Sequence, residues 1–85
     1  MRQYTAGEIL RVRTAPDGRP LSFIWRGETH RVASIEEIRE PLLDWWAPEA
    51  AVHRRYVLLI TLRGLICEIY HDLLADTWHL SRVFD

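Results

Sequence analysis

The sequence predicts an all-β domain with one short helix, built as a strongly bent antiparallel sheet or small barrel of about six strands. Three observations support this fold class. Short runs of alternating apolar and polar residues are separated by turn residues throughout the chain. Four Trp, three Tyr and two Phe supply a large buried area from few positions. One predicted hairpin, over residues 56–70, is apolar on both faces, and closing the sheet is expected to cover them both and to leave no exposed edge.

The chain is predicted to be a single domain over residues 1–85, because a chain of 85 residues is too short to divide into two cores. Residues 1–7 are expected to form a loosely ordered N-terminal segment. The formal net charge of −1 gives no global field that would attract nucleic acid or anionic lipid. No apolar run approaches membrane-spanning length, so a cytoplasmic protein without a membrane partner is expected.

The first strand is predicted at residues 9–14, where apolar and charged side chains alternate as in a half-buried sheet. Residues 21–25 follow as a second strand with three large side chains on one face. The dipeptide Gly-Glu at residues 27–28 is predicted to be a two-residue hairpin loop. That loop would place Trp25 opposite His30 on the third strand.

A short helix is predicted after this hairpin. Residues 34–37, Ser-Ile-Glu-Glu, have the spacing of a capping box, with acidic side chains in the first turn. Pro41 disfavours the helical conformation at Glu40, so the helix would have one or two turns at most. Residues 42–52 follow as an irregular stretch without strand periodicity.

The clearest alternation in the chain predicts the hairpin over residues 56–70, with a two-residue Arg-Gly turn. This turn length puts the following side chains on the core-facing side: Leu58, Ile60, Cys67 and Ile69. A last strand is predicted over residues 77–84. Its register depends on the length of the preceding turn, which the sequence leaves open.

No group of residues meets the requirements of an enzyme site, so a non-enzymatic protein is predicted. Cys67 lies in mid-strand and is interpreted as a small buried hydrophobe, and a single cysteine excludes an internal disulfide. The histidines lack the spacing of a metal-ligand pair, so neither a metal nor another cofactor is expected. They are His30, His53, His71 and His79.

The irregular stretch is the leading candidate for a functional surface, because loops on a rigid sheet often carry binding residues. Its candidate partner-binding residues are Trp45, Trp46 and Pro48. Adjacent side chains of an extended segment point in opposite directions, so Trp45 is expected to pack and Trp46 to remain exposed as an anchor for another protein. A homo-oligomer is also compatible with the sequence.

The alternative function is weak binding of single-stranded nucleic acid by a small β-barrel. Such barrels stack bases on aromatic side chains within a basic groove. The arginines that would line this groove are Arg26, Arg31, Arg54 and Arg55, together with Arg63. The aromatic side chains near them are Trp25, Tyr56 and Trp46. The same arginines also fit ordinary solvent-exposed strand faces.

A series of short motifs runs through residues 9–85. In order, the motifs are Asp17-Gly18-Arg19-Pro20, Phe23 with Trp25-Arg26-Gly27, Arg31-Val32, Trp45-Trp46, Arg55-Tyr56, Ile69-Tyr70 with Asp72, and Trp78 with Leu80 and Arg82-Val83-Phe84-Asp85. This series resembles the uncharacterised C-terminal domain of ImuB-like proteins, catalytically inactive relatives of Y-family DNA polymerases, which also occurs as short stand-alone proteins. His30 departs from the pattern, which has an aromatic residue there.

The resemblance implies an accessory or interaction module connected with damage-tolerant DNA synthesis. Its partner would be another protein of DNA repair or translesion synthesis. The polymerase-like body of those proteins has no counterpart in this sequence, so the resemblance carries over no catalytic residue and no polymerase chemistry.

Overall fold

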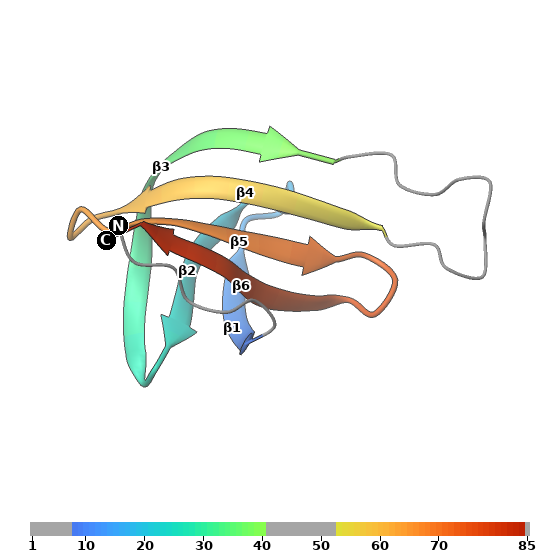
Figure 1. Cartoon of the computed structure of the whole chain (residues 1–85), viewed down its shortest axis with the longest axis horizontal. Helices are drawn as coiled ribbons and strands as arrows, with labels where there is room; N and C mark the ends of the chain where they lie inside the picture. The colour runs from blue at the N-terminus through green and yellow to red at the C-terminus, as the bar shows by residue number, and fades with distance from the viewer. Residues whose placement is uncertain (1–7, 41–52, 85) are drawn as a thin grey trace.

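The computed structural model describes residues 8–40 and 53–84, which form six antiparallel strands closed into a small barrel (Figure 1). The strands are β1 (Glu8–Thr14), β2 (Pro20–Trp25), β3 (Glu28–Arg39), β4 (Arg54–Thr61), β5 (Ile66–Asp72) and β6 (Thr77–Phe84). Each strand pairs with the next along the chain, and β6 returns to pair with β1. The predicted all-β fold with six strands is therefore confirmed, in its barrel form.

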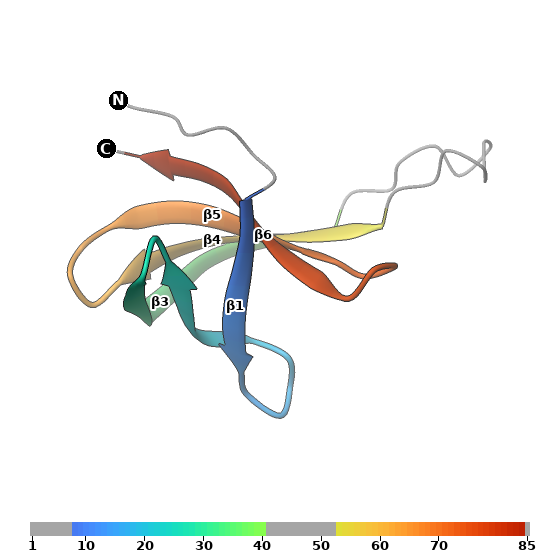
Figure 2. The ribbon, with the colours of Figure 1, turned by 90° about the horizontal axis from the view of Figure 1, so that it is seen from below.

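The barrel closes because β3 is long and bent. Its 12 residues pair first with β2 and then with β4, and Figure 1 shows it turning from the direction of β2 to that of β4. The register with β4 shifts between Val32 and Ser34 and again between Ile35 and Glu37, and such bulges bend a strand. As a result β1 stands across the direction of β4 and β5 (Figure 2).

The core lies inside the barrel and draws on five of the strands. Its buried hydrophobic side chains are Leu10, Phe23, Val57, Leu59, Cys67, Ile69, Leu80 and Val83. Partly buried side chains of β3, including Val32 and Ile35, complete the packing. Cys67 is fully buried, which confirms its interpretation as a core residue.

The predicted helix at residues 34–37 is wrong, since this segment belongs to β3 and no helix occurs in the described ranges. Ile35 pairs with Leu59 across the sheet, so strand pairing outweighs the local helix signal. The Ser34 hydroxyl donates a hydrogen bond of 2.7 Å to the Glu36 carboxylate instead of capping a helix. Residues 1–7, 41–52 and 85 lie outside the described ranges, and with them the segment expected to be loosely ordered.

The predicted facing of the β4–β5 hairpin is wrong by one residue. The Thr61 amide donates to the Leu65 carbonyl at 2.9 Å, so three residues form the turn, and Gly64 supplies the positive φ of 88° that this turn needs. A slip of one residue exchanges the two faces of a strand. Val57 and Leu59 therefore fill the core in place of the predicted Leu58 and Ile60, which lie half-buried on the outer face. Cys67 and Ile69 face the core as predicted.

Closing the barrel consequently covers only one face of this hairpin, so the expectation that both would be covered is wrong. The outer face carries Tyr56, Leu58, Ile60, Ile66, Glu68 and Tyr70. These outer side chains are covered only by one another and by their neighbours, because no further strand among the described residues packs over this face.

The β2–β3 loop also differs from the prediction. It is formed by Arg26 and Gly27, with φ of 52° and 79°, and the paired residues are Trp25 with Glu28 and Phe23 with His30. Positive φ at both loop positions matches the right-handed twist of the flanking strands. The His30 ring still packs on both aromatic side chains, with ring centroids 5.3 Å from Phe23 and 5.9 Å from Trp25.

Leu59→Ala should lower the free energy of unfolding by about 2–5 kcal/mol, because it empties a fully buried core position. Ile60→Ala, on the outer face of the same strand, should lower it by only about 1 kcal/mol. Urea denaturation of both variants measures the difference. An equal or larger loss at Ile60 would contradict the observed register.

Candidate functional site

The two predicted arginines of β4 are held by neighbouring side chains. The Arg54 guanidinium lies 4.6 Å from the centre of the Tyr70 ring and donates to the Tyr56 hydroxyl at 3.4 Å. Nε of Arg55 pairs with the Glu40 carboxylate at 3.1 Å. Both guanidinium groups therefore already have partners within the fold.

The other three predicted arginines lie near the β2–β3 and β4–β5 turns. Arg26 occupies the β2–β3 turn with its guanidinium 4.9 Å from the centre of the Trp25 ring. Arg63, in the β4–β5 turn, pairs with the Glu28 carboxylate at 3.3 Å, and both side chains are well exposed. Arg31 is exposed on the outer face of β3.

The predicted arginines do not line one groove. Arg31 lies beside the end of β4, because the Leu62 amide donates to its carbonyl at 2.9 Å. Arg54 begins β4, seven residues before Thr61, which corresponds to about 23 Å along a strand. The structure thus separates Arg54 and Arg55 from Arg31 and Arg63.

A different set of arginines is aligned on the outer surface of β1–β3. Cross-strand pairing places Arg13 opposite Ser22 and Ser22 opposite Arg31. The next row pairs Arg11 with Ile24, and Ile24 with Thr29. We call this surface the arginine face, made up of Arg11, Arg13, Ser22, Ile24, Thr29 and Arg31.

The alternation of β1 explains why the arginine face forms. Leu10 is buried and Val12 packs against the core, so Arg11 and Arg13 must point outward. Arg11 and Arg13 are two residues apart along β1, which corresponds to about 7 Å. Arg13 and Arg31 are two strands apart, which corresponds to about 10 Å. The sequence interpretation omitted Arg11 and Arg13, although their alternation with Leu10 and Val12 was a signal for their outward direction.

The arginine face differs from the rest of the barrel in its charge balance. Among the residues that the structure describes, no carboxylate pairs with Arg11, Arg13 or Arg31. By contrast, five other arginines each pair with a carboxylate: Arg19, Arg39, Arg55, Arg63 and Arg82. A shallow hollow of about 300 Å³ lies on the face between its side chains. The face therefore presents uncompensated positive charge beside two hydroxyl groups and an exposed isoleucine.

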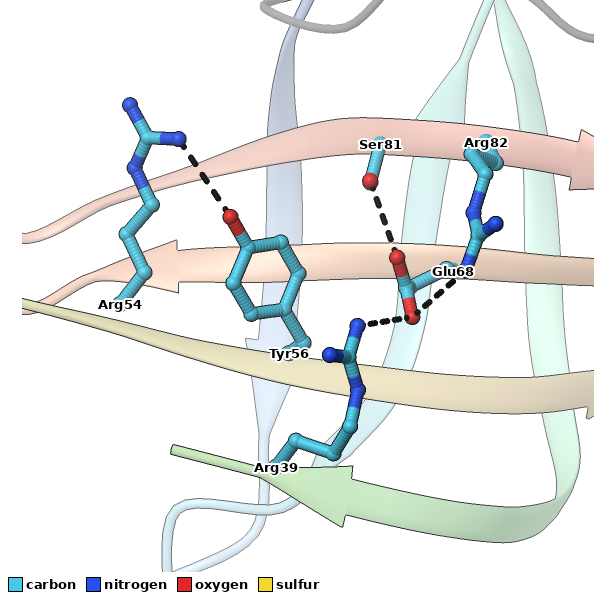
Figure 3. Close-up of polar contacts among 6 residues, drawn as sticks. All are labelled: Arg39, Arg54, Tyr56, Glu68, Ser81 and Arg82. Carbon is cyan, nitrogen blue, oxygen red and sulfur yellow. Dashed lines mark hydrogen bonds and ion pairs between the residues drawn. The ribbon is translucent and has the colours of Figure 1, made fainter. Parts of the chain in front are cut away.

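On the outer face of β5 the positive charges are compensated, because a buried carboxylate accepts hydrogen bonds from several neighbouring side chains (Figure 3). Glu68 is only 3% exposed. It accepts hydrogen bonds from Arg39 at 2.9 Å, Ser81 at 3.0 Å and Arg82 at 3.5 Å. Burial raises the pKa of Glu68, but Arg39, Ser81 and Arg82 together outweigh it and hold the pKa below its usual value.

The aromatic side chains beside Glu68 are equally engaged with one another. The Tyr56 and Tyr70 rings lie 5.4 Å apart, and His79 stacks on Tyr70 at 4.9 Å. The Arg39 guanidinium covers Tyr56 at 4.9 Å. This side of the barrel therefore has its charges and rings matched internally, which indicates a structural role.

The remaining sequence candidates give no second site in the described ranges. Trp45, Trp46 and Pro48 lie outside the described residues. Burial raises the pKa of the Cys67 thiol to about 12, so it stays protonated at neutral pH. His71 reaches the Asp76 carboxylate at 2.9 Å, but the described residues contain no cluster of three or more metal-ligating side chains.

The described residues include no helix that is long and apolar enough to cross a membrane.

Glu68→Gln should flatten the dependence of stability on pH. The pKa of Glu68 is lower in the folded than in the unfolded chain, so the unfolded chain binds the proton more tightly and wild-type stability falls as the pH falls. We expect the variant to lose less stability than the wild type between about pH 5 and pH 3, measured by urea denaturation. Glu8→Gln, at an exposed position of β1, is the control and should follow the wild-type profile. Parallel profiles for wild type and Glu68→Gln would contradict this role for Glu68.

The model of a family described as a domain of unknown function (DUF6504) matches residues 5–85. Neither the curated proteins nor the solved structures contain a significant match to the chain. Because the family match covers nearly the whole sequence, the chain belongs to the DUF6504 family.

Proposed function

We propose that this barrel is a non-enzymatic accessory module that binds single-stranded nucleic acid weakly through the arginine face. One observation carries the proposal: Arg11 and Arg13 on β1 and Arg31 on β3 are exposed on the same side of the sheet, with β2 between them, and no carboxylate pairs with them in the described residues. Exposed, uncompensated arginines are the side chains that neutralise backbone phosphates and release their counterions.

The neighbouring groups on the face suit the same ligand. Hydroxyl groups such as those of Ser22 and Thr29 commonly contact phosphate and sugar oxygens. Ile24, 40% exposed between them, offers an apolar contact to a sugar or base. No aromatic side chain belongs to the arginine face, so the support is for phosphate contacts rather than for base stacking. Binding should therefore depend little on sequence.

The expected strength follows from the number of arginines. Three phosphate contacts to a single strand give a slope of about −2 in a plot of log K against log salt concentration. The chain as a whole carries a net charge of −1, so it adds no general attraction for a polyanion. Both facts favour weak, strongly salt-dependent binding.

The protein-binding role predicted for Trp45 and Trp46 stays a prediction, because both residues lie outside the described ranges. It is compatible with the arginine face, since the two surfaces use different residues. The resemblance to the domain of ImuB-like proteins supports an accessory role in damage-tolerant DNA synthesis. A module that contacts both single-stranded DNA and another repair protein would fit that role.

The double variant Arg13→Ala, Arg31→Ala should weaken binding to a labelled single strand of about 15 nucleotides by about tenfold. Removing two of three phosphate contacts should also reduce the salt slope from about −2 to about −0.7. Fluorescence anisotropy over a range of salt concentrations measures both quantities.

Arg19→Ala is the matched control, because Arg19 is exposed but pairs with Asp17 at 2.7 Å in the β1–β2 turn. It should bind like the wild type. Unchanged affinity and slope in the double variant, or a wild-type slope near zero, would contradict the proposed function.

A further inference from the structure

A second hollow of about 340 Å³ lies beside the arginine face, between the start of β3 and the β4–β5 turn. The residues that line it are Thr29, His30, Arg31, Thr61, Leu62 and Arg63. Thr29 and Arg31 also belong to the arginine face, so the two surfaces are continuous. A strand bound along the arginine face would reach this hollow with one of its ends.

The imidazole of His30 is the least expected group in this hollow. Its side chain is 9% exposed, and its Nδ1 is buried without a hydrogen-bond partner among the described residues. Its Nε2 lies 3.9 Å from the Glu28 carboxylate, beyond hydrogen-bond distance. Burying an imidazole whose N–H has no acceptor lowers stability, so such a group in a folded protein calls for an explanation, and a bound ion is one of the recognised ones.

The ring of His30 is nevertheless held firmly in place. It stacks on Phe23, with a centroid distance of 5.3 Å and an interplanar angle of 19°, and it contacts Trp25 from another side. A ring fixed in this way loses little conformational entropy when it contacts a ligand. The hollow therefore has a rigid polar wall.

Two arginines at the hollow supply its charge. Arg31 has no described carboxylate partner, and Arg63 pairs only with Glu28, through an ion pair of 3.3 Å in which both side chains are more than 60% exposed. An ion pair so exposed to water contributes little, so a more highly charged anion can displace the carboxylate. A phosphomonoester carries nearly two negative charges at neutral pH, whereas each phosphodiester within a strand carries one.

We propose that this hollow binds the terminal phosphomonoester of a single strand whose backbone lies on the arginine face. The guanidinium groups of Arg31 and Arg63 hold the phosphate oxygens and the Thr29 hydroxyl donates a further hydrogen bond, while Nε2 of His30 reaches the phosphate from the core side of β3. Glu28 competes with the phosphate for Arg63. The proposal rests on the proposed function for the path of the strand, but not for the phosphate site itself.

The first test compares single strands that carry a 5′-phosphate, a 3′-phosphate or hydroxyl groups at both ends. One phosphorylated strand should bind about tenfold more tightly than the hydroxyl-ended strand, and the comparison identifies which end is recognised. Arg63→Ala should abolish this preference and leave binding of the hydroxyl-ended strand within about twofold of wild type. Glu28→Gln should strengthen the preference, and Arg19→Ala should leave it unchanged.

The second test separates this proposal from the proposed function. A nucleoside 5′-monophosphate and a nucleoside 3′-monophosphate, titrated into the protein, should shift the NMR signals of His30, Thr29 and Thr61 even in the variant Arg11→Ala, Arg13→Ala, which removes two charges of the arginine face and leaves Arg31 in the hollow. Shifts in that variant support the phosphate site whether or not longer strands bind. Equal affinity for all three strands, or a preference that survives Arg63→Ala, would overturn the assignment, as would titrations that leave the His30 signals unmoved.

Discussion

The bend of β3 is the constraint on which the rest of the barrel depends. One continuous strand of 12 residues serves two sheets, and its bulges turn the second sheet across the first. Without that turn β1 would not meet β6, and the inward side chains of β1 and β2 would have no opposing layer. The same bend leaves the other side of β1–β3 open to water, so the enclosure of the core and the exposure of the arginine face have one geometric cause.

The distribution of acidic side chains then divides the arginines into two groups. On β4–β6 the charges are compensated, because Glu68 binds Arg39 and Arg82 while Glu40 binds Arg55. A buried carboxylate such as Glu68 needs this number of donors to remain ionised. The arginine face on β1–β3, by contrast, includes no acidic residue. Arginine is thus a structural residue on one side of the barrel and an accessible charge on the other.

Alternating hydrophobicity was sufficient to predict six strands, because the period of two does not depend on the turn geometry, but it left a bent open sheet and a closed barrel as alternatives. The sequence could not predict which side chains of β4 face the core. The Arg-Gly dipeptide fits a turn of two or of three residues, and these two turn lengths turn opposite faces of the strand toward the core. The helix at residues 34–37 failed because pairing with β4 outweighs a local capping pattern. The outward direction of Arg11 and Arg13 could be predicted from the alternation of β1, but the alignment of Arg13 with Arg31 across β2 required the register of three strands.

Among the described residues, the pairing of β1 with β6 is the shortest in the barrel, and we expect it to open first. Within the described residues β1 joins β6 through only three residue pairs, whereas β5 and β6 are paired along most of their length. Local opening at this seam requires breaking few hydrogen bonds, so amide protons there should exchange before those of the β4–β5 hairpin. Each opening uncovers an unpaired edge on β6, and β1 of a second molecule can occupy it. Unpaired strand edges are where copies of a β protein exchange strands, so the β1–β6 seam is where such exchange would begin in this barrel.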